Sequence, residues 1–204
     1  MQQEYNIKNC EFLLGSLIDS TSLEARFGGG SFLPQNIDWP SNVEGRKLVL
    51  LFSIPMNFIG DVHSEELYLS VFTTYYEGYF LDEVIDNGED ESEVEKYSST
   101  KVLIHKKGDS CRSEADIALK SFSLILGNNI SEMDNINEGI WRIGGAPLYL
   151  QNAPKIVDDM IFVIQFYTGN LPSEYQDILY LSDAIGYLFI KKDLSGGYFF
   201  GQCT

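Results

Sequence analysis

The phrase RFGGGSFLPQN at residues 26–36 returns as RIGGAPLYLQN at residues 142–152. Five of the eleven positions match without a gap: the leading arginine, both members of a glycine pair and the closing Gln-Asn. Repetition of this kind indicates that one supersecondary unit buries its apolar face against a copy of itself. The repeated phrase therefore predicts one domain built from two related halves.

The segments after each phrase extend the match. A strand-like block rich in β-branched and aromatic residues follows each copy, KLVLLFSI at 47–54 and MIFVIQFY at 160–167. A second such block comes next, ELYLSVF at 66–72 and GYLFI at 186–190. The order of elements is the same in both halves, which predicts a mainly β fold: a single domain over residues 1–204, with two internally duplicated, intertwined β halves in a barrel-like or sandwich arrangement and few short helices.

The remaining segments give weaker signals. KVLIH at 101–105 predicts a further strand, and the aromatic tail GGYFFGQCT is expected to join a sheet. A short helix is plausible before Ile18. Residues 115–126 fit a helix or a strand, because SFSLIL has no clear period.

The glycine pairs do not match nucleotide-binding loops. No G-x-x-x-x-G-K-[ST] string occurs, and Phe32-Leu33-Pro34 follows the first glycines where a dinucleotide fingerprint would begin a helix. We expect these glycines to hold positive φ or a close chain approach at a tight turn. Arg26 and Arg142 are then predicted to bind neighbouring carbonyls or a carboxylate, with a paired small-ligand site as the alternative.

These motifs resemble the YwqG-like family, a bacterial group of domains of unknown function. The residues that match the family's leading motif are Gly28, Gly29, Leu33, Pro34, Trp39 and Pro40. The resemblance covers roughly residues 20–80 and 138–203, which we take as the two repeat halves, and it implies a β-rich, internally duplicated fold without an established catalytic activity. Ser53 stands where the family carries Gln in the first strand, while Gln165 keeps it in the second. That Gln serves a ligand or satisfies a buried backbone group.

The net charge is −16, from 30 acidic and 14 basic residues. Nucleic acid is an unlikely ligand for such a chain, because phosphate binding depends on clustered Lys and Arg. A basic protein would be steered toward it, and solubility alone is the other explanation. Three cysteines without metal-type spacing, no secretion signal and no apolar run of 18 residues indicate a reduced, cytoplasmic protein without a membrane span.

The acidic insertion at about 81–99 concentrates this charge. Eight of the fourteen residues from 82 to 95 are acidic. Such a block repels itself and is expected to form a solvated loop or short helix, or else to bind a cationic partner. The predicted partner-binding residues are Asp82, Glu83, Asp86, Glu89, Asp90, Glu91, Glu93 and Glu95.

Catalytic and metal-binding patterns are weak. Only His63 and His105 are histidines; His105 could pair with Cys111, although a lone Cys and His on a hairpin need no special role. The carboxylates follow no EF-hand pattern. We therefore predict no catalytic group, no metal and no cofactor.

Two hypotheses follow. The first is a non-enzymatic cytoplasmic inhibitor of the immunity type, which binds and neutralises a basic bacterial toxin. The second is a small-ligand-binding module with its site at the junction of the two repeats, and a carboxylate enzyme comes third. The residues predicted for the ligand site are Arg26, Trp39, Arg142, Gln151 and Gln165.

Overall fold

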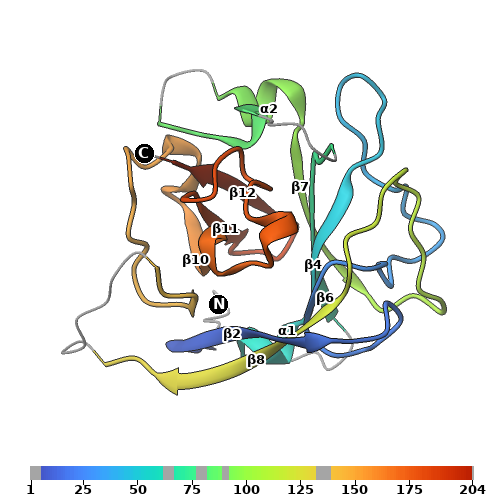
Figure 1. Cartoon of the computed structure of the whole chain (residues 1–204), viewed down its shortest axis with the longest axis horizontal. Coiled ribbons are helices and arrows are strands. Elements are labelled where there is room, and N and C mark those ends of the chain that lie inside the picture. Colours follow the sequence, from blue (N-terminus) through green and yellow to red (C-terminus); the bar gives the residue numbers. More distant parts are fainter. Residues whose placement is uncertain (1–5, 62–66, 77–81, 89–91, 132–138, 204) are drawn as a thin grey trace.

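The computed structural model describes residues 6–61, 67–76, 82–88, 92–131 and 139–203. Within these residues ten strands close into a barrel in the order β10-β11-β12-β7-β6-β4-β3-β8-β2-β9 (Figure 1). The barrel strands are β2 (Cys10–Leu17), β3 (Arg26–Phe27), β4 (Val49–Pro55), β6 (Leu67–Thr73), β7 (Thr100–Lys106), β8 (Phe122–Asn129), β9 (Arg142–Ile143), β10 (Met160–Tyr167), β11 (Ile185–Lys191) and β12 (Gly197–Gln202). The prediction of a mainly β domain with few short helices is confirmed.

The other elements are short. A two-stranded pair joins β1 (Asn6–Ile7) to β5 (Gly60–Asp61), and the α-helices are α1 (Met56–Ile59) and α2 (Glu93–Tyr97). Single 3₁₀ turns lie at Asp82–Val84, Lys155–Val157, Thr168–Asn170 and Ser173–Tyr175. None of the described helices is long and apolar enough to cross a membrane.

The strand order has an approximate two-fold repeat. Reading around the barrel, β8-β3-β4-β6-β7 is followed by β12-β11-β10-β9-β2. Arg26 lies opposite Ser53 in the first half as Arg142 lies opposite Gln165 in the second. In chain order, however, β2 precedes β3 and β8 precedes β9. Each half therefore gives its first strand to the wall of the other half.

This exchange corrects one prediction and decides between the two alternatives of another. The segment before Ile18 is strand β2 and not a helix, and residues 122–126 of the ambiguous stretch begin strand β8. The repeat units also reach beyond the predicted bounds of 20–80 and 138–203, because β2 and β8 belong to them. Both strands carry apolar residues on both faces, so neither shows the period of two on which a strand prediction depends.

The glycine phrase provides the turn at which the exchanged strands cross. Gly28 and Gly144 have φ of 69° and 67°. A Cβ on Gly28 would overlap the carbonyl oxygen of Lys120, just before β8, and a Cβ on Gly144 would overlap that of Lys8, just before β2. The second glycine of each pair also has positive φ, so the prediction for the glycines is confirmed.

The largest buried cluster draws residues from all parts of the barrel wall. Phe52 of the first half meets Phe166 of the second edge to face, with ring centroids 5.1 Å apart. Phe166 also contacts Trp141, which packs against Phe12 of the exchanged strand β2. Aromatic contacts of this kind add to the burial of apolar area, so the central core joins both halves.

Two smaller clusters lie outside the barrel wall. Tyr198 and Phe200 point away from the central core, into which Phe199 between them points. The loop at 149–157 and helix α2 cover this face of β10, β11 and β12. The loop at 33–41 covers the equivalent face of β4 and β6 with Leu33 and Trp39. Each glycine phrase thus begins a loop that covers the outer face of its own half.

Replacement of Gly144 by alanine tests the close approach to Lys8. Gly144→Ala should lower the free energy of unfolding by about 3 kcal/mol or more, because it adds backbone strain and a clash with a backbone carbonyl. Gly45→Ala is the matched control, since Gly45 has φ of 81° and nothing lies within 4 Å of a Cβ there. The control should lose only about 1–2 kcal/mol in urea denaturation. Equal losses of unfolding free energy in the two variants would show that the close approach to Lys8 does not contribute to stability.

Candidate functional site

A groove of about 620 Å³ lies over the seam between β7 and β12, where the two halves meet. Gly197 and Val102 form the one register pair between these strands within the described residues, so the wall is loosely joined there. The lining comes from residues 37–41, 94–95, 98, 100–101, 103, 156, 160, 191 and 197–198. It combines apolar side chains such as Met160 with the charged side chains of Glu95, Lys101 and Lys191.

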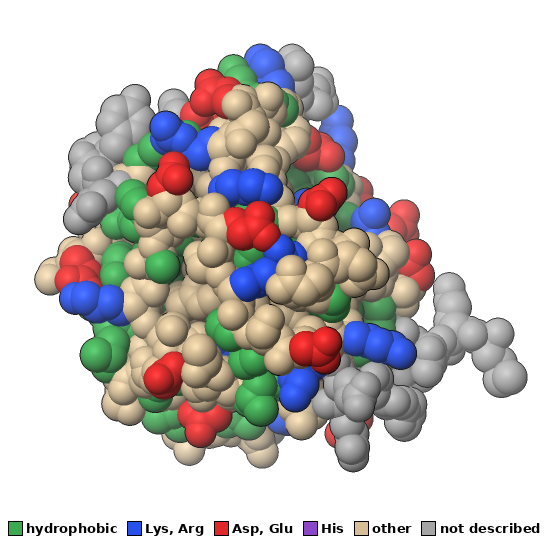
Figure 2. Space-filling view, turned by 90° about the vertical axis from the view of Figure 1, so that its right-hand side faces the viewer, with side chains coloured by type: hydrophobic (Ala, Val, Ile, Leu, Met, Phe, Trp, Pro, Cys, Tyr) green, Lys and Arg blue, Asp and Glu red, His purple; other side chains and the backbone are tan. Residues whose placement is uncertain are grey.

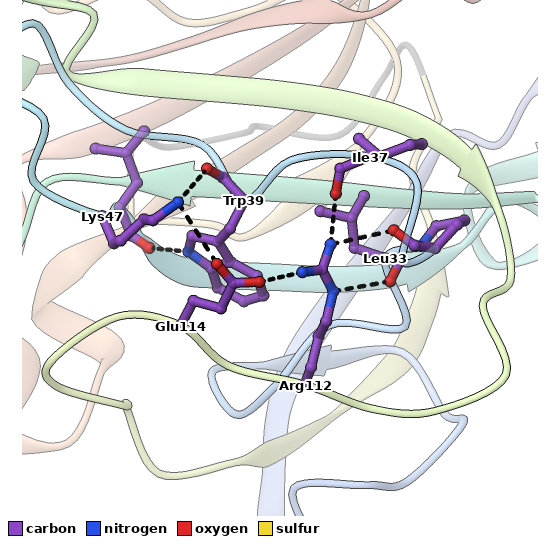
Figure 3. Close-up of polar contacts among 8 residues, drawn as sticks. Leu33, Ile37, Trp39, Lys47, Arg112 and Glu114 are labelled. Carbon is purple, nitrogen blue, oxygen red and sulfur yellow. Dashed lines mark hydrogen bonds and ion pairs between the residues drawn. The ribbon is translucent and has the colours of Figure 1, made fainter.

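One wall of the groove is the loop at 37–41, which a charged network holds in place (Figure 3). The Arg112 guanidinium donates to the carbonyl oxygens of Leu33, at 3.1 Å, and of Ile37, and it pairs with Glu114. Lys47 bridges Glu114 and the carbonyl oxygen of Trp39. Because a guanidinium has several donors in a fixed fork, one side chain can satisfy several loop carbonyls. Sequence analysis missed Arg112, which belongs to no motif.

Trp39 borders the groove but is itself buried. Its indole N–H donates to the carbonyl oxygen of Leu48 at 2.7 Å, and its ring packs edge to face on Phe72. The tryptophan therefore shapes this wall from beneath and presents little surface to a ligand.

The opposite wall is helix α2, which belongs to the acidic insertion (Figure 1). The insertion is anchored at Asp86, whose side chain is only 3% exposed. This carboxylate accepts hydrogen bonds from the hydroxyls of Ser92 and Tyr198, both at 2.7 Å, and from the N–H of Gly88 at 2.9 Å. The N–H of Asp86 donates to the carbonyl oxygen of Gly201 on β12. The carboxylate of Asp86, predicted to contact a partner, is therefore turned inward, where it holds the segment against the barrel.

The other predicted acidic residues lie in different surroundings. Glu93 and Glu95 are exposed on α2, and Glu83 is half-buried. Asp82 lies in a 3₁₀ turn. Glu89, Asp90 and Glu91 lie outside the described residues, as does His63. Of the predicted partner-binding set, the structure thus places two carboxylates on the surface beside the groove.

Tyr198 links the anchor to the floor of the groove. Burial and the hydrogen bond to Asp86 raise the pKa of its hydroxyl far above the ordinary value of about 10. The hydroxyl therefore stays protonated and donates to the carboxylate over the whole physiological pH range.

The predicted ligand residues do not converge on one site. Arg26 and Arg142 are both buried, and strands β8 and β2 lie between the strands that carry them. Arg26 donates to the carbonyl oxygens of Ser22 and Gly30, as the sequence analysis predicted for neighbouring carbonyls. Burial lowers the pKa of both guanidinium groups, which nevertheless remain charged at neutral pH.

Arg142 and Gln165 are neighbours across β9 and β10. The Arg142 guanidinium lies 5.6 Å from the ring centroid of Phe162. Within the part of the chain that the structure describes, its Nε and Nη2 and the Nε2 of Gln165 have no hydrogen-bond partner. The Oε1 of Gln165 accepts from the N–H of Leu148 at 2.9 Å. Gln165 thus satisfies a buried backbone group, which is one of the two roles expected for it.

Gln151 is exposed and belongs to the loop that covers the second half. Its N–H donates to Gln202, and its side-chain amide donates to the carbonyl oxygen of Cys203 at 2.6 Å. Gln202 also accepts from the N–H of Leu150. These side chains hold the backbone of the LYLQN segment, so this copy of the phrase serves architecture.

His105 borders a second hollow of about 580 Å³ between residues 33–37 and 104–110. Its Nδ1 contacts the carbonyl oxygen of Lys106 at 2.7 Å, and its Nε2 contacts the hydroxyl of Ser70 at 2.9 Å. Burial lowers the pKa of the imidazole, so the neutral ring donates through Nδ1 and accepts from Ser70. The thiol of Cys111 contacts the carbonyl oxygen of Ser20. Both residues have other partners, so the contacts give no support to a Cys–His pair.

Among the described residues no group of three or more His, Cys, Asp or Glu side chains is arranged to hold a metal ion. Acidic and basic side chains are interspersed on the face at the right-hand side of Figure 1 (Figure 2). The net negative charge is therefore not a uniform field over this face. Sequence comparisons with protein-family models and with curated proteins match no family and no curated protein.

The anchor of the acidic insertion can be tested by substitution. Asp86→Ala should lower the free energy of unfolding by about 1–3 kcal/mol, because it removes the buried acceptor that the Ser92 and Tyr198 hydroxyls share. Glu93→Ala is the matched control on the exposed face of α2 and should change the free energy by less than about 0.5 kcal/mol. Urea denaturation measures both. Equal small effects would contradict the anchoring role.

Proposed function

We propose that this chain is a non-enzymatic cytoplasmic binding protein, an acidic inhibitor of the immunity type that binds and neutralises a basic bacterial toxin. The observation that carries the proposal is the anchored acidic insertion. Asp86 fixes the segment to the barrel, and Glu93 and Glu95 remain exposed beside the groove. Carboxylates on a fixed element bind a cationic surface with less loss of conformational entropy than carboxylates on a free loop.

The charge balance adds long-range support. A net charge of −16 attracts a basic protein before contact and raises the association rate, an effect that salt weakens. The groove beside α2 supplies what a charged surface alone lacks, the apolar side chains of Met160 and Ile156 within a lining of mixed polarity. A basic partner would place an apolar side chain there, with its cationic groups against α2. Membership of the YwqG-like family stays a prediction from the motifs.

The second candidate function is binding of a small ligand in the same groove. The observation that favours it is the position of the groove at the junction of the two repeats, where the ligand site was expected, although Trp39 alone of the predicted ligand residues borders it. Such a ligand would be enclosed between the loop at 37–41 and α2.

The test begins with capture of partners from the host by the tagged chain, at low and at moderate salt. We expect one basic protein in stoichiometric amount, whose own activity is lost when the purified chain is added. Neutralisation of α2 by Glu93→Gln with Glu95→Gln should slow capture several-fold and weaken its salt dependence. Neutralisation of Glu24 and Asp116, which are exposed outside α2 and the groove, makes the same change in charge and is the control.

Three results would contradict the inhibitor proposal. The captured protein could keep its activity in the presence of the chain. The two double variants could slow capture equally. That result would show that only the net charge of the chain matters, and that α2 is not a binding surface. An empty eluate, together with a small molecule released on denaturation of the chain, would favour the ligand-binding function instead.

A further inference from the structure

The guanidinium of Arg142 is a buried cation with open hydrogen-bond donors. Arg142 is 2% exposed, and Gln165 beside it is fully buried. Within the described residues the Nε and Nη2 of Arg142 and the Nε2 of Gln165 have no hydrogen-bond partner. A buried charge is costly unless it is paired and hydrogen-bonded. A bound acceptor would remove this cost.

The open nitrogens of Arg142 form one edge of the guanidinium. The N–H of Nε and one N–H of Nη2 point in the same direction, and together they can bind two oxygens of a carboxylate or a phosphate. Gln165 lies directly opposite Arg142 in the antiparallel ladder, so both side chains rise from the same face of the wall. The Oε1 of Gln165 already accepts from the N–H of Leu148, which leaves its Nε2 as a further donor. A group of donors alone selects an oxyanion.

The equivalent arginine of the first half has acceptors within the chain. Arg26 donates through Nη1 and Nη2 to the carbonyl oxygens of Ser22 and Gly30, and only its Nε lacks a partner in the described residues. Ala146 corresponds to Gly30 in the second copy of the phrase, but the Nη2 of Arg142 makes no such bond. The duplicated framework thus uses one arginine to hold its loop and leaves the edge of the other open.

The carboxylate that flanks Arg142 in the ladder is turned away from it. Glu11 on β2 is the register partner of Arg142 on the side opposite Gln165. The Oε2 of Glu11 would lie 3.4 Å from a Cβ on Gly127, so this carboxylate reaches over β8, whereas Arg142 lies on β9 at the other side of β2. Glu11 therefore does not supply the missing acceptor.

The loop that follows β9 covers the two side chains but leaves a short route to solvent. Leu148 in this loop is held by Gln165 and by the hydroxyl of Tyr187, which donates to its carbonyl oxygen at 2.7 Å. Gly145 is exposed, and a Cβ there would lie 3.8 Å from the Nη1 of Arg142. The guanidinium thus lies just beneath an exposed glycine. We propose that Arg142 and Gln165 bind a small oxyanion, a carboxylate or phosphate group, under this loop.

Titration of the whole chain with acetate and, separately, with inorganic phosphate tests the proposal. NMR follows the Nε–H resonance of Arg142, and chloride keeps the ionic strength constant. At least one of the two ions should shift this resonance to saturation with a Kd of about 1 mM, the affinity expected for so small a ligand. Tighter binding of acetate assigns the site to a carboxylate, and tighter binding of phosphate assigns it to a phosphate group.

Gln165→Glu supplies an acceptor from within the chain. The new carboxylate can keep one oxygen for the N–H of Leu148 and pair with Arg142 through the other. The Arg142 resonance should then be shifted without any added ion, and the Kd should rise at least about tenfold. Gln35→Glu adds the same charge at an exposed position of the first copy of the phrase and should bind as the wild type does. Circular dichroism establishes that both variants keep the fold.

An Arg142 resonance of the wild-type chain that neither ion shifts would show that water satisfies these donors, and it would overturn the proposal whether or not the variants fold. Equal loss of affinity in Gln165→Glu and Gln35→Glu would also overturn it, because net charge alone would then explain the loss. The site does not depend on the inhibitor proposal, since neither Arg142 nor Gln165 lines the groove beside α2.

Discussion

The close approach of a backbone carbonyl to a glycine at positive φ is the constraint on which this fold depends. It occurs at both crossings of the exchanged strands, with Lys8 against Gly144 and Lys120 against Gly28. Lys8 lies just before β2 and Lys120 just before β8, the two exchanged strands. At each crossing, the glycine turn of a repeated phrase packs against this segment. The same turns are also bonded to the barrel wall. The N–H groups of Gly28 and Gly144 donate to backbone carbonyl oxygens of β4 and β10. Any side chain at these two positions would separate the halves where they interlock.

The exchange of strands determines how firmly the barrel wall is joined at its two seams. It closes the wall firmly at β2 and β8, and it leaves the second seam, between β7 and β12, with little pairing. The acidic insertion fills part of that seam through Asp86, and the groove remains beside it. The two seams thus differ in character, since the seam beside α2 holds a groove with a mixed polar and apolar lining, whereas β2 and β8 are joined by a long antiparallel ladder.

The sequence predicted the parts of this arrangement that have a local signal. The strands from KLVLLFSI to the aromatic tail, the glycine turns and the duplication were all visible as patterns. The exchange was not, because apolar residues on both faces of β2 and β8 hide their period. Asp86 could not be told from its acidic neighbours either, since its inward orientation depends on Tyr198, which is 112 residues away in the chain. Arg26 and Arg142 were correctly paired as equivalents, but equivalence in a two-fold fold places residues apart and does not bring them into one site.

Native-state hydrogen exchange on the whole chain tests the central claim, that the exchanged strands make the two halves one cooperative unit. The informative amides are those of Phe12 and Leu124, which donate across the exchange to the carbonyl oxygens of Trp141 and Ala25. The account predicts that both open with the same free energy as the amides of β4 and β10, at the level of global unfolding. Opening of Phe12 and Leu124 at a clearly lower free energy, with β4 and β10 still protected, would contradict it.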